Sequence, residues 1–309
     1  MSHVQQAVER GGGGEYKAAH MIKPAPAAIC GPNAQHAYVL CPSFVAAKKQ
    51  ALNDVATQGS VHTASGATDK VKALAAKSGI SGNEVRVLTL ADYKEAALSL
   101  AEAFKEDHTS TYFTHTPDRA HWTEQQRWDL HVKIMEYIVY AHLLKGLVVS
   151  AGPNYESVAL WMPPGKNMDD YATILRSGMW RLYYQLSQEG RHRFFQEFLP
   201  LLGDTKSQVL RERDQDSWYL VYVGTRPSGR GKGYARKVVE YCTSMADEEG
   251  KACYLESSHA VNLKIYEKMG FRLKRVVYLQ REEDLIKLDI MVREPRVLLG
   301  SDADSGVDV

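Results

Sequence analysis

A short turn rich in glycine and basic residues is the first part of the sequence that could do chemistry. Residues 221–241, VYVGTRPSGRGKGYARKVVEY, begin as a β-branched run and end in a helical pattern. The first N–H groups of a helix have no partner inside it, and the helix dipole adds partial positive charge there. Glycine lets a phosphate approach the backbone, and Arg230 and Lys232 add positive charge. The turn predicts an anion site, although a tight connection with solvated basic side chains has the same composition.

Two common phosphate-binding motifs do not fit this turn. A Walker A loop requires Lys and then Ser or Thr after its second glycine, whereas Arg230 and Gly231 follow Gly229 here. A dinucleotide fingerprint requires a third small residue, and the corresponding positions hold Tyr234 or Arg236. The turn therefore belongs to neither class of nucleotide-binding loop.

A third pattern does fit the turn. RGKGYA at residues 230–235 reads as [Q/R]-x-x-G-x-[G/A] and resembles the acyl-CoA pyrophosphate loop of the GNAT superfamily of N-acetyltransferases. A second stretch, YLESSHAVNLKIYEKMGF at residues 254–271, is similar to the fifth strand and following helix of that superfamily. The resemblance is strong over residues 216–280 and weaker over 84–215, and its details are most similar to the puromycin acetyltransferase branch and its fungal relatives.

The resemblance implies where an acyl-CoA would bind. In this superfamily the fourth and fifth strands part, and the pantetheine arm lies along the edge of the fourth strand, here Val223, Gly224 and Thr225. The pyrophosphate would lie on the backbone of the turn, at Arg230, Gly231, Lys232, Gly233, Tyr234 and Ala235. His259 stands where many relatives carry a cofactor-contacting asparagine, and Asn262 is expected to take over that contact.

The same resemblance assigns catalytic roles. Tyr266 matches the tyrosine that contacts the cofactor and protonates the leaving thiolate, with a core aromatic as the alternative. A phenol of pKa about 10 can protonate a thiolate of pKa about 8.5 only slightly uphill. Because an amine is mostly protonated at pH 7, a base is also needed. Glu256 is the candidate base, with a structural carboxylate as an equal alternative and His259 and Tyr222 as other bases. A backbone amide near Val223 would stabilise the oxyanion.

The acceptor pocket is expected to draw on the helices after the first strand, residues 161–180 and the last strands. Glu256 and several aromatic residues are candidates, each of which is equally at home in a core: Tyr112, Phe113, Trp161, Trp180 and Tyr183. Several aromatics together would suit a flat, apolar amine. The histidines at 108, 115, 121 and 131 lack the spacing of metal ligands, so no metal is expected.

The elements that must position these residues follow from hydrophobic periodicity. Alternating or β-branched runs predict strands at residues 84–90, 147–152, 157–163, 217–225, 251–258, 271–280 and 285–294. Helical spacing predicts helices at residues 93–107, 124–144, 168–201, 234–249 and 260–269. This order predicts an α/β (α+β) fold of the GNAT type, with a mixed central sheet of about seven strands that parts between strands 4 and 5 and helices on both faces.

Composition limits the broader context. The chain has 309 residues and a net charge of +1, so no general attraction to nucleic acid or membrane is expected. We expect an N-terminal extension at residues 1–82 that is partly disordered, an acetyltransferase domain at 83–296, and a mobile acidic tail at 297–309. The four cysteines lack CxxC spacing, which favours free buried thiols, and no run is long enough to span a membrane, so a cytoplasmic protein is expected.

These observations predict an acetyl-CoA-dependent N-acetyltransferase that acts on the primary amine of a small molecule. A protein or peptide acetyltransferase, for lysine or an N-terminus, is one alternative. A non-catalytic CoA-binding sensor on the same fold is another. The sequence does not name the amine, and it leaves a homodimer open.

Overall fold

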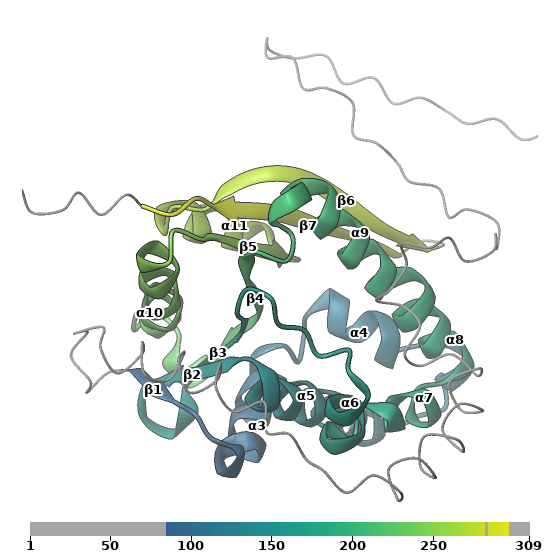
Figure 1. Ribbon diagram of the computed structural model, residues 1–309. Coiled ribbons are helices and arrows are strands. Elements are labelled where there is room, and N and C mark those ends of the chain that lie inside the picture. The colour runs from purple at the N-terminus through teal and green to yellow at the C-terminus, as the bar shows by residue number, and fades with distance from the viewer. Residues whose placement is uncertain (1–84, 282–283, 297–309) are drawn as a thin grey trace, which may run out of the picture.

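A central sheet of seven strands, with helices on both faces, makes up the described part of the chain (Figure 1). The computed structural model describes residues 85–281 and 284–296. The strand order across the sheet is β1-β2-β3-β4-β5-β7-β6. The strands are β1 (Val85–Val87), β2 (Leu147–Ala151), β3 (Ser157–Met162), β4 (Ser217–Thr225), β5 (Ala252–Ser257), β6 (Arg272–Arg281) and β7 (Asp284–Arg293). The expected mixed sheet is confirmed, while the expectations for residues 1–82 and 297–309 lie outside the described residues.

The sheet parts at its centre. All neighbouring strands are antiparallel except β4 and β5, which are parallel and pair only from Ser217–Ala252 to Leu220–Leu255. Against β3, the register of β4 shifts by one residue at Val221, which is a β-bulge. Beyond the bulge, β4 keeps its pairing with β3 but pairs with no strand on its other side among the described residues. The predicted separation of strands 4 and 5 is therefore present.

Nine α-helices surround the sheet in the described ranges. They are α3 (Tyr93–Ala103), α4 (His108–Thr114), α5 (Glu124–Lys145), α6 (Tyr171–Ser177), α7 (Leu182–Gln185), α8 (Gln188–Arg191), α9 (Leu199–Leu210), α10 (Tyr234–Glu248) and α11 (Ala260–Lys268). The first expected helix is too long at its C-terminal end, because Asp107 starts a new helix instead. Its Oδ1 accepts hydrogen bonds from the N–H groups of Thr109 and Ser110 at the start of α4.

The prediction of a single helix at residues 168–201 is wrong. Gly178, at φ 82°, ends α6, and the chain turns again before Ser187, whose hydroxyl caps α8. From there one continuous helix runs through a π turn (His192–Phe198) into α9 and ends at Leu210. The widened turn has a clear cause, since Pro200 has no N–H to donate and the N–H of Leu199 bonds Phe194 O five residues back.

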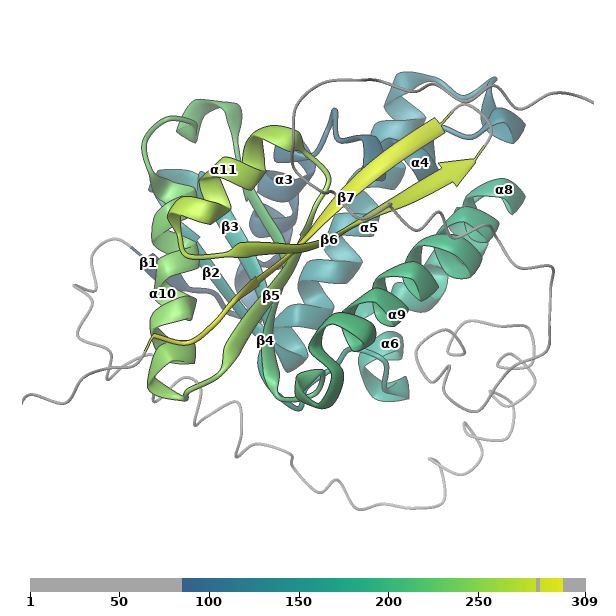
Figure 2. The same ribbon diagram turned by 90° about the horizontal axis from the view of Figure 1, so that it is seen from above.

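Two hydrophobic clusters lie on opposite faces of the sheet. Figure 2 shows α10 and α11 together on one side and α5 and α9 together on the other. Every residue of β2 and β3 is buried, because both faces of these strands are covered. Cys242 and Cys253 are free and buried, as expected; Cys30 and Cys41 lie outside the described residues. No helix in the described ranges is long and apolar enough to cross a membrane.

Candidate functional site

A cavity of about 280 Å³ opens where β4 and β5 part. One end is lined by residues of the parted strands and of α11, namely Val223, Glu256, Ser257, Ser258, Asn262 and Tyr266. The other end is lined by apolar residues from α5, the π turn and α9. The structure thus brings Glu256, Asn262 and Tyr266 to one cavity although they come from two elements.

Glu256 carries a carboxyl group that is shielded from water. Burial raises its pKa to about 7, and the hydrogen bond from Tyr219 partly opposes this shift. The Tyr219 hydroxyl donates to Oε2 at 2.7 Å, and the Tyr219 ring packs edge-on against Tyr254. Oε1 is buried and meets no partner in ordinary hydrogen-bond geometry among the described residues, but the buried Tyr254 hydroxyl lies close enough to lower the pKa of Glu256 as Tyr219 does. A buried carboxylate with a pKa near neutrality is suited to take up a proton.

Tyr266 projects from α11 into the same cavity. Its side chain is 8% exposed, and its ring lies edge-on against Phe271 with centroids 5.8 Å apart. Burial raises the pKa of the phenol above its ordinary value, so the hydroxyl stays protonated near neutral pH. The residue therefore packs as a core aromatic and also lines the cavity with its hydroxyl protonated.

The two alternative bases are placed differently. Tyr222 lines the cavity, packs edge-on against Phe104, and has its pKa raised by burial and then by Asp107. His259 is exposed and is the N-cap residue of α11, where its Nδ1 accepts from the N–H of Val261 at 3.3 Å. His259 is not among the residues that line the cavity.

The glycine turn offers an open backbone at the start of α10. Gly231 and Gly233 have φ of 76° and 77°, and a Cβ on either would meet no atom within 4 Å. Within the described residues, the N–H groups of Gly231, Gly233 and Tyr234 donate to no backbone carbonyl. The Lys232 ammonium forms an ion pair, since its Nζ lies 3.3 Å from Glu156 Oε1.

The last residues of β4, Gly224 and Thr225, come directly before this turn in the sequence. Gly224 is a close-packing position, because a Cβ there would lie 2.8 Å from Ala103 Cβ on α3. Thr225 is fixed by a hydroxyl–hydroxyl contact of 3.0 Å with Ser157 on β3. Over residues 221–225, the edge of β4 that faces away from β3 pairs with no other strand among the described residues.

The aromatic residues expected in the acceptor pocket do not line this cavity. Trp161 is fully buried against Trp218 in the cluster beneath α10, on the other face of the sheet. Tyr112 and Phe113 are buried on α4, and Phe113 packs on Phe194. Trp180 is half-buried beside Arg181, and Tyr183 packs on Tyr184 and Phe195.

Some cavity residues were not anticipated from the sequence. Tyr219 reaches the cavity from the same strand as Tyr222 and packs on the same hydrophobic cluster, although the two are three residues apart, because the bulge at Val221 interrupts the alternation. Asp107 lines the cavity and accepts from the Ser258 hydroxyl at 2.6 Å, which ties the start of α4 to the loop after β5. This contact spans 151 residues of sequence, and no local pattern indicates it.

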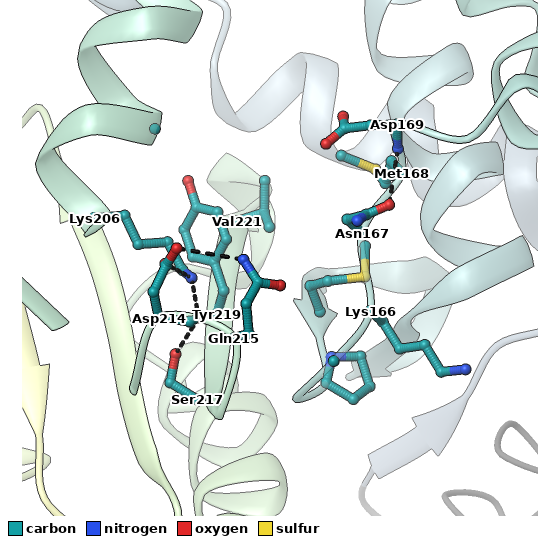
Figure 3. A pocket seen from close by; sticks show the side chains of 14 residues that line it. Lys166, Asn167, Met168, Asp169, Lys206, Asp214, Gln215, Ser217, Tyr219 and Val221 are labelled. Atoms are coloured by element: carbon teal, nitrogen blue, oxygen red, sulfur yellow. Dashed lines mark hydrogen bonds and ion pairs between the residues drawn. The ribbon is translucent and has the colours of Figure 1, made fainter. Parts of the chain in front are cut away.

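A second, smaller cavity of about 160 Å³ adjoins the first and shares six lining residues with it, namely Met168, Asp169, Gly203, Lys206, Tyr219 and Val221. Figure 3 shows Lys206 and Asp214 on one side and the loop Lys166–Asp169 on the other. The polar groups of this cavity bind one another. Lys206 Nζ lies 2.5 Å from Asp214 Oδ1, and Gln215 donates to Asp214 Oδ2 at 3.3 Å.

A mixed sheet that parts at a parallel central pair, followed by a glycine turn at a helix start, is the fold of an N-acetyltransferase. The chain belongs to the acetyltransferase (GNAT) family. The model of that family matches residues 201–271. An uncharacterised N-acetyltransferase of Schizosaccharomyces pombe is 51% identical over 204 residues, which cover 66% of this chain and 80% of the relative.

Two solved structures are similar to this chain at low sequence identity. One from Corynebacterium glutamicum, described as histone acetyltransferase HPA2 and related acetyltransferase, is 22% identical with a TM-score of 0.44 and covers 69% of this chain and 97% of its own. Arylalkylamine N-acetyltransferase 2 from Aedes aegypti is 16% identical with a TM-score of 0.47 and covers 69% of this chain and 98% of its own.

Proposed function

We propose that this N-acetyltransferase moves the acetyl group of acetyl-CoA to the primary amine of a small molecule. The observation that carries the proposal is the meeting of an unpaired strand edge with a cavity that holds Glu256 and Tyr266. The edge suits an extended donor, and the cavity beside it suits a small acceptor. Acetyl-CoA supplies an activated thioester and a pyrophosphate by which it can be held.

The residues present fit that donor. The open N–H groups around Gly231 and Gly233 face no protein atom that would block a phosphate, and the start of α10 favours negative charge. In this proposal the turn Arg230–Ala235 holds the pyrophosphate and the edge Val223–Thr225 holds the pantetheine arm. Asn262 contacts the arm from the cavity side, while His259 acts as a helix cap.

The proton steps are assigned to two side chains. The Glu256 carboxylate takes the first proton of the ammonium, so that the nitrogen lone pair can attack the acetyl carbon. The amide near Val223 donates a hydrogen bond to the carbonyl oxygen as it gains charge. As the carbon–sulfur bond breaks, Tyr266 gives its hydroxyl proton to the sulfur, and the second proton of the amine restores Tyr266.

The first test measures thiol release from acetyl-CoA with a panel of alkylamines, aromatic amines, polyamines and lysine peptides. We expect release with small amines, and Tyr266→Phe should lower kcat by roughly 100-fold with the dissociation constant of CoA unchanged. An unchanged kcat removes Tyr266 as the acid. Release with peptides alone favours a protein acetyltransferase. CoA binding without release by any amine favours a non-catalytic sensor.

The second test concerns the glycine turn. Gly233→Asp puts a side chain and a negative charge where the pyrophosphate is proposed, and it should abolish CoA binding in calorimetry. Gly250→Asp is the matched control, since Gly250 also has a positive φ (66°) and open space around its Cβ, but lies at the other end of α10. Equal loss of binding in both variants would contradict the proposed phosphate site.

A further inference from the structure

The cavity has a polar end and an apolar end. Glu256 and Tyr266 mark the polar end, at the parted strands. The apolar end lies beneath the helix that carries the π turn, and it contains Ile138, Met179, Phe194, Phe198, Leu199 and Leu202. A molecule that reaches Glu256 with its nitrogen would lay its remaining atoms against these side chains.

The ionisable residues that line the cavity differ in whether their charged groups already have partners. Asp107 caps α4 and accepts from Ser258, and Lys206 is bound to Asp214. Asp169 also has a partner. Glu256 lines the cavity, and its hydrogen-bonding neighbours Tyr219 and Tyr254 are neutral phenols, so its negative charge has no ion-pair partner among the described residues. The cavity is therefore equipped to receive one positive charge at one place.

The widened helical turn helps to build the apolar end. The N–H of Leu199 bonds to Phe194 O, so this turn holds one more residue than an α-helical turn. Phe194 and Phe198 within the π turn and Leu202 after it all line the cavity. Phe194 and Phe198 also pack on Phe113, which supports their rings. These apolar residues offer no charge, and the ammonium of Lys206, further along the same helix, is already bound to Asp214.

We propose that the acceptor is an amine with a single positive charge and an apolar body. Its nitrogen lies at the Glu256 carboxyl group, and its body lies against Phe198 and Leu202. A second ammonium or a peptide backbone would lose its water against this wall without gaining a partner. The cavity volume of about 280 Å³ leaves room for a small amine. The inference rests on the acetyltransferase activity proposed above.

The unaltered protein allows a direct test with pairs of amines. Along the series from ethylamine to hexylamine, kcat/KM should rise about fourfold for each added methylene until the cavity is full. Hexylamine and 1,5-diaminopentane have the same length, and the second differs only by an ammonium in place of the terminal methyl. We expect kcat/KM for hexylamine to exceed that for the diamine at least tenfold. A flat series, or a preferred diamine or lysine peptide, overturns the inference.

A variant should reverse the preference. Leu202→Asp places a carboxylate at the apolar end, so KM for the diamine should fall and KM for hexylamine should rise, each about tenfold. Leu201→Asp is the matched control, because Leu201 is a half-buried leucine on the same helix that does not line the cavity. If both variants change the ratio of the two amines equally, the specificity is not set at Leu202 and the inference fails.

The outcomes separate this inference from the proposed activity. Thiol release with hydrophilic amines but not with apolar ones overturns the inference and leaves the activity standing. Absence of release with every amine, while CoA still binds, overturns both. A rising alkylamine series with the diamine disfavoured supports both.

Discussion

Glu256 is a residue whose ionisation is expected to affect both the stability of the fold and the reaction. Its carboxyl lies in a buried cavity and accepts one hydrogen bond from a neutral phenol, so its charged form is less stable than that of an exposed glutamate. The pKa of about 7 means that the group changes charge within the range in which most proteins operate. Two predictions follow from this environment, one for folding and one for catalysis.

Glu256→Gln should change how stability depends on pH. The folded-state pKa of about 7 lies above the ordinary value of 4.5. The stability from this group is therefore fully present below pH 4.5 and is lost as the pH rises through 7. Glutamine removes that loss. The free energy of unfolding of the variant, relative to the parent, should rise by up to about 3 kcal/mol between pH 5 and pH 8. Urea unfolding at both pH values measures it, and an equal difference at both contradicts it.

Tyr219→Phe should move the pH profile of the reaction. The lost hydrogen bond lowers the pKa of Glu256 in the parent, so the variant should ionise Glu256 only at higher pH. The acid limb of kcat/KM should shift upward by on the order of one unit. Tyr222→Phe serves as the comparison, since Tyr222 lines the cavity without bonding Glu256. A shift with Tyr222→Phe alone would identify Tyr222 as the base.

The candidate site could be predicted from the sequence only where a motif carries it. Glu256 and Tyr266 stand in a recognisable stretch, and both face the cavity. Tyr219 could not be linked to Glu256, because the two are 37 residues apart and meet only when two strands lie side by side. Trp161 shows the opposite error. Strand alternation turns it to the other face, so its aromatic character says nothing about the site.

Among the elements, strands and turns were more predictable than the middle helices. The hairpin of β2 and β3 and the helix after the glycine turn follow from alternation, helical spacing and glycine, which are local signals. The segment between β3 and β4 has a nearly continuous helical pattern, yet Gly178 breaks it and Pro200 widens it. Periodicity alone cannot tell a continuous helix from a series of short ones that all pack on one core.

The end of α10 is fixed to β7 by a buried ion pair, which gives a prediction at this scale. Asp247 bonds both Nη atoms of Arg293, at 2.7 and 2.6 Å, and the Arg293 side chain is 3% exposed. Asp247→Ala leaves that charge buried without its partner and should lower the free energy of unfolding by about 3–5 kcal/mol.

The exposed pair Arg236–Glu240 on the same helix is the control for that measurement. Both side chains are about half exposed or more, at 64% and 48%. Glu240→Ala should therefore lower the free energy of unfolding by less than about 1 kcal/mol. Similar losses in the two variants, measured by urea unfolding, would show that burial does not decide the strength of the Asp247 contact.

At the scale of the whole molecule, both hydrophobic clusters and every described strand come from residues 85–293. We therefore propose that residues 83–296 form the folding unit. A protein that begins at residue 83 should keep its melting temperature within a few degrees of the full chain and unfold in one transition. Differential scanning calorimetry of the two proteins decides this, and a large drop in the melting temperature would show that earlier residues belong to the core.

The open side of β4 has a consequence for how the protein behaves among other proteins. An unpaired strand edge is a template on which another chain can add a strand, and exposed edges promote aggregation. Here the unpaired length, residues 221–225, is short and carries a bulge, and Val221, Tyr222 and Val223 within it line the cavity. A short, bulged edge offers few consecutive hydrogen bonds to the strand of another protein, whereas an extended ligand needs only a few. The feature that fits the edge for a ligand therefore also makes it a poor template for self-association.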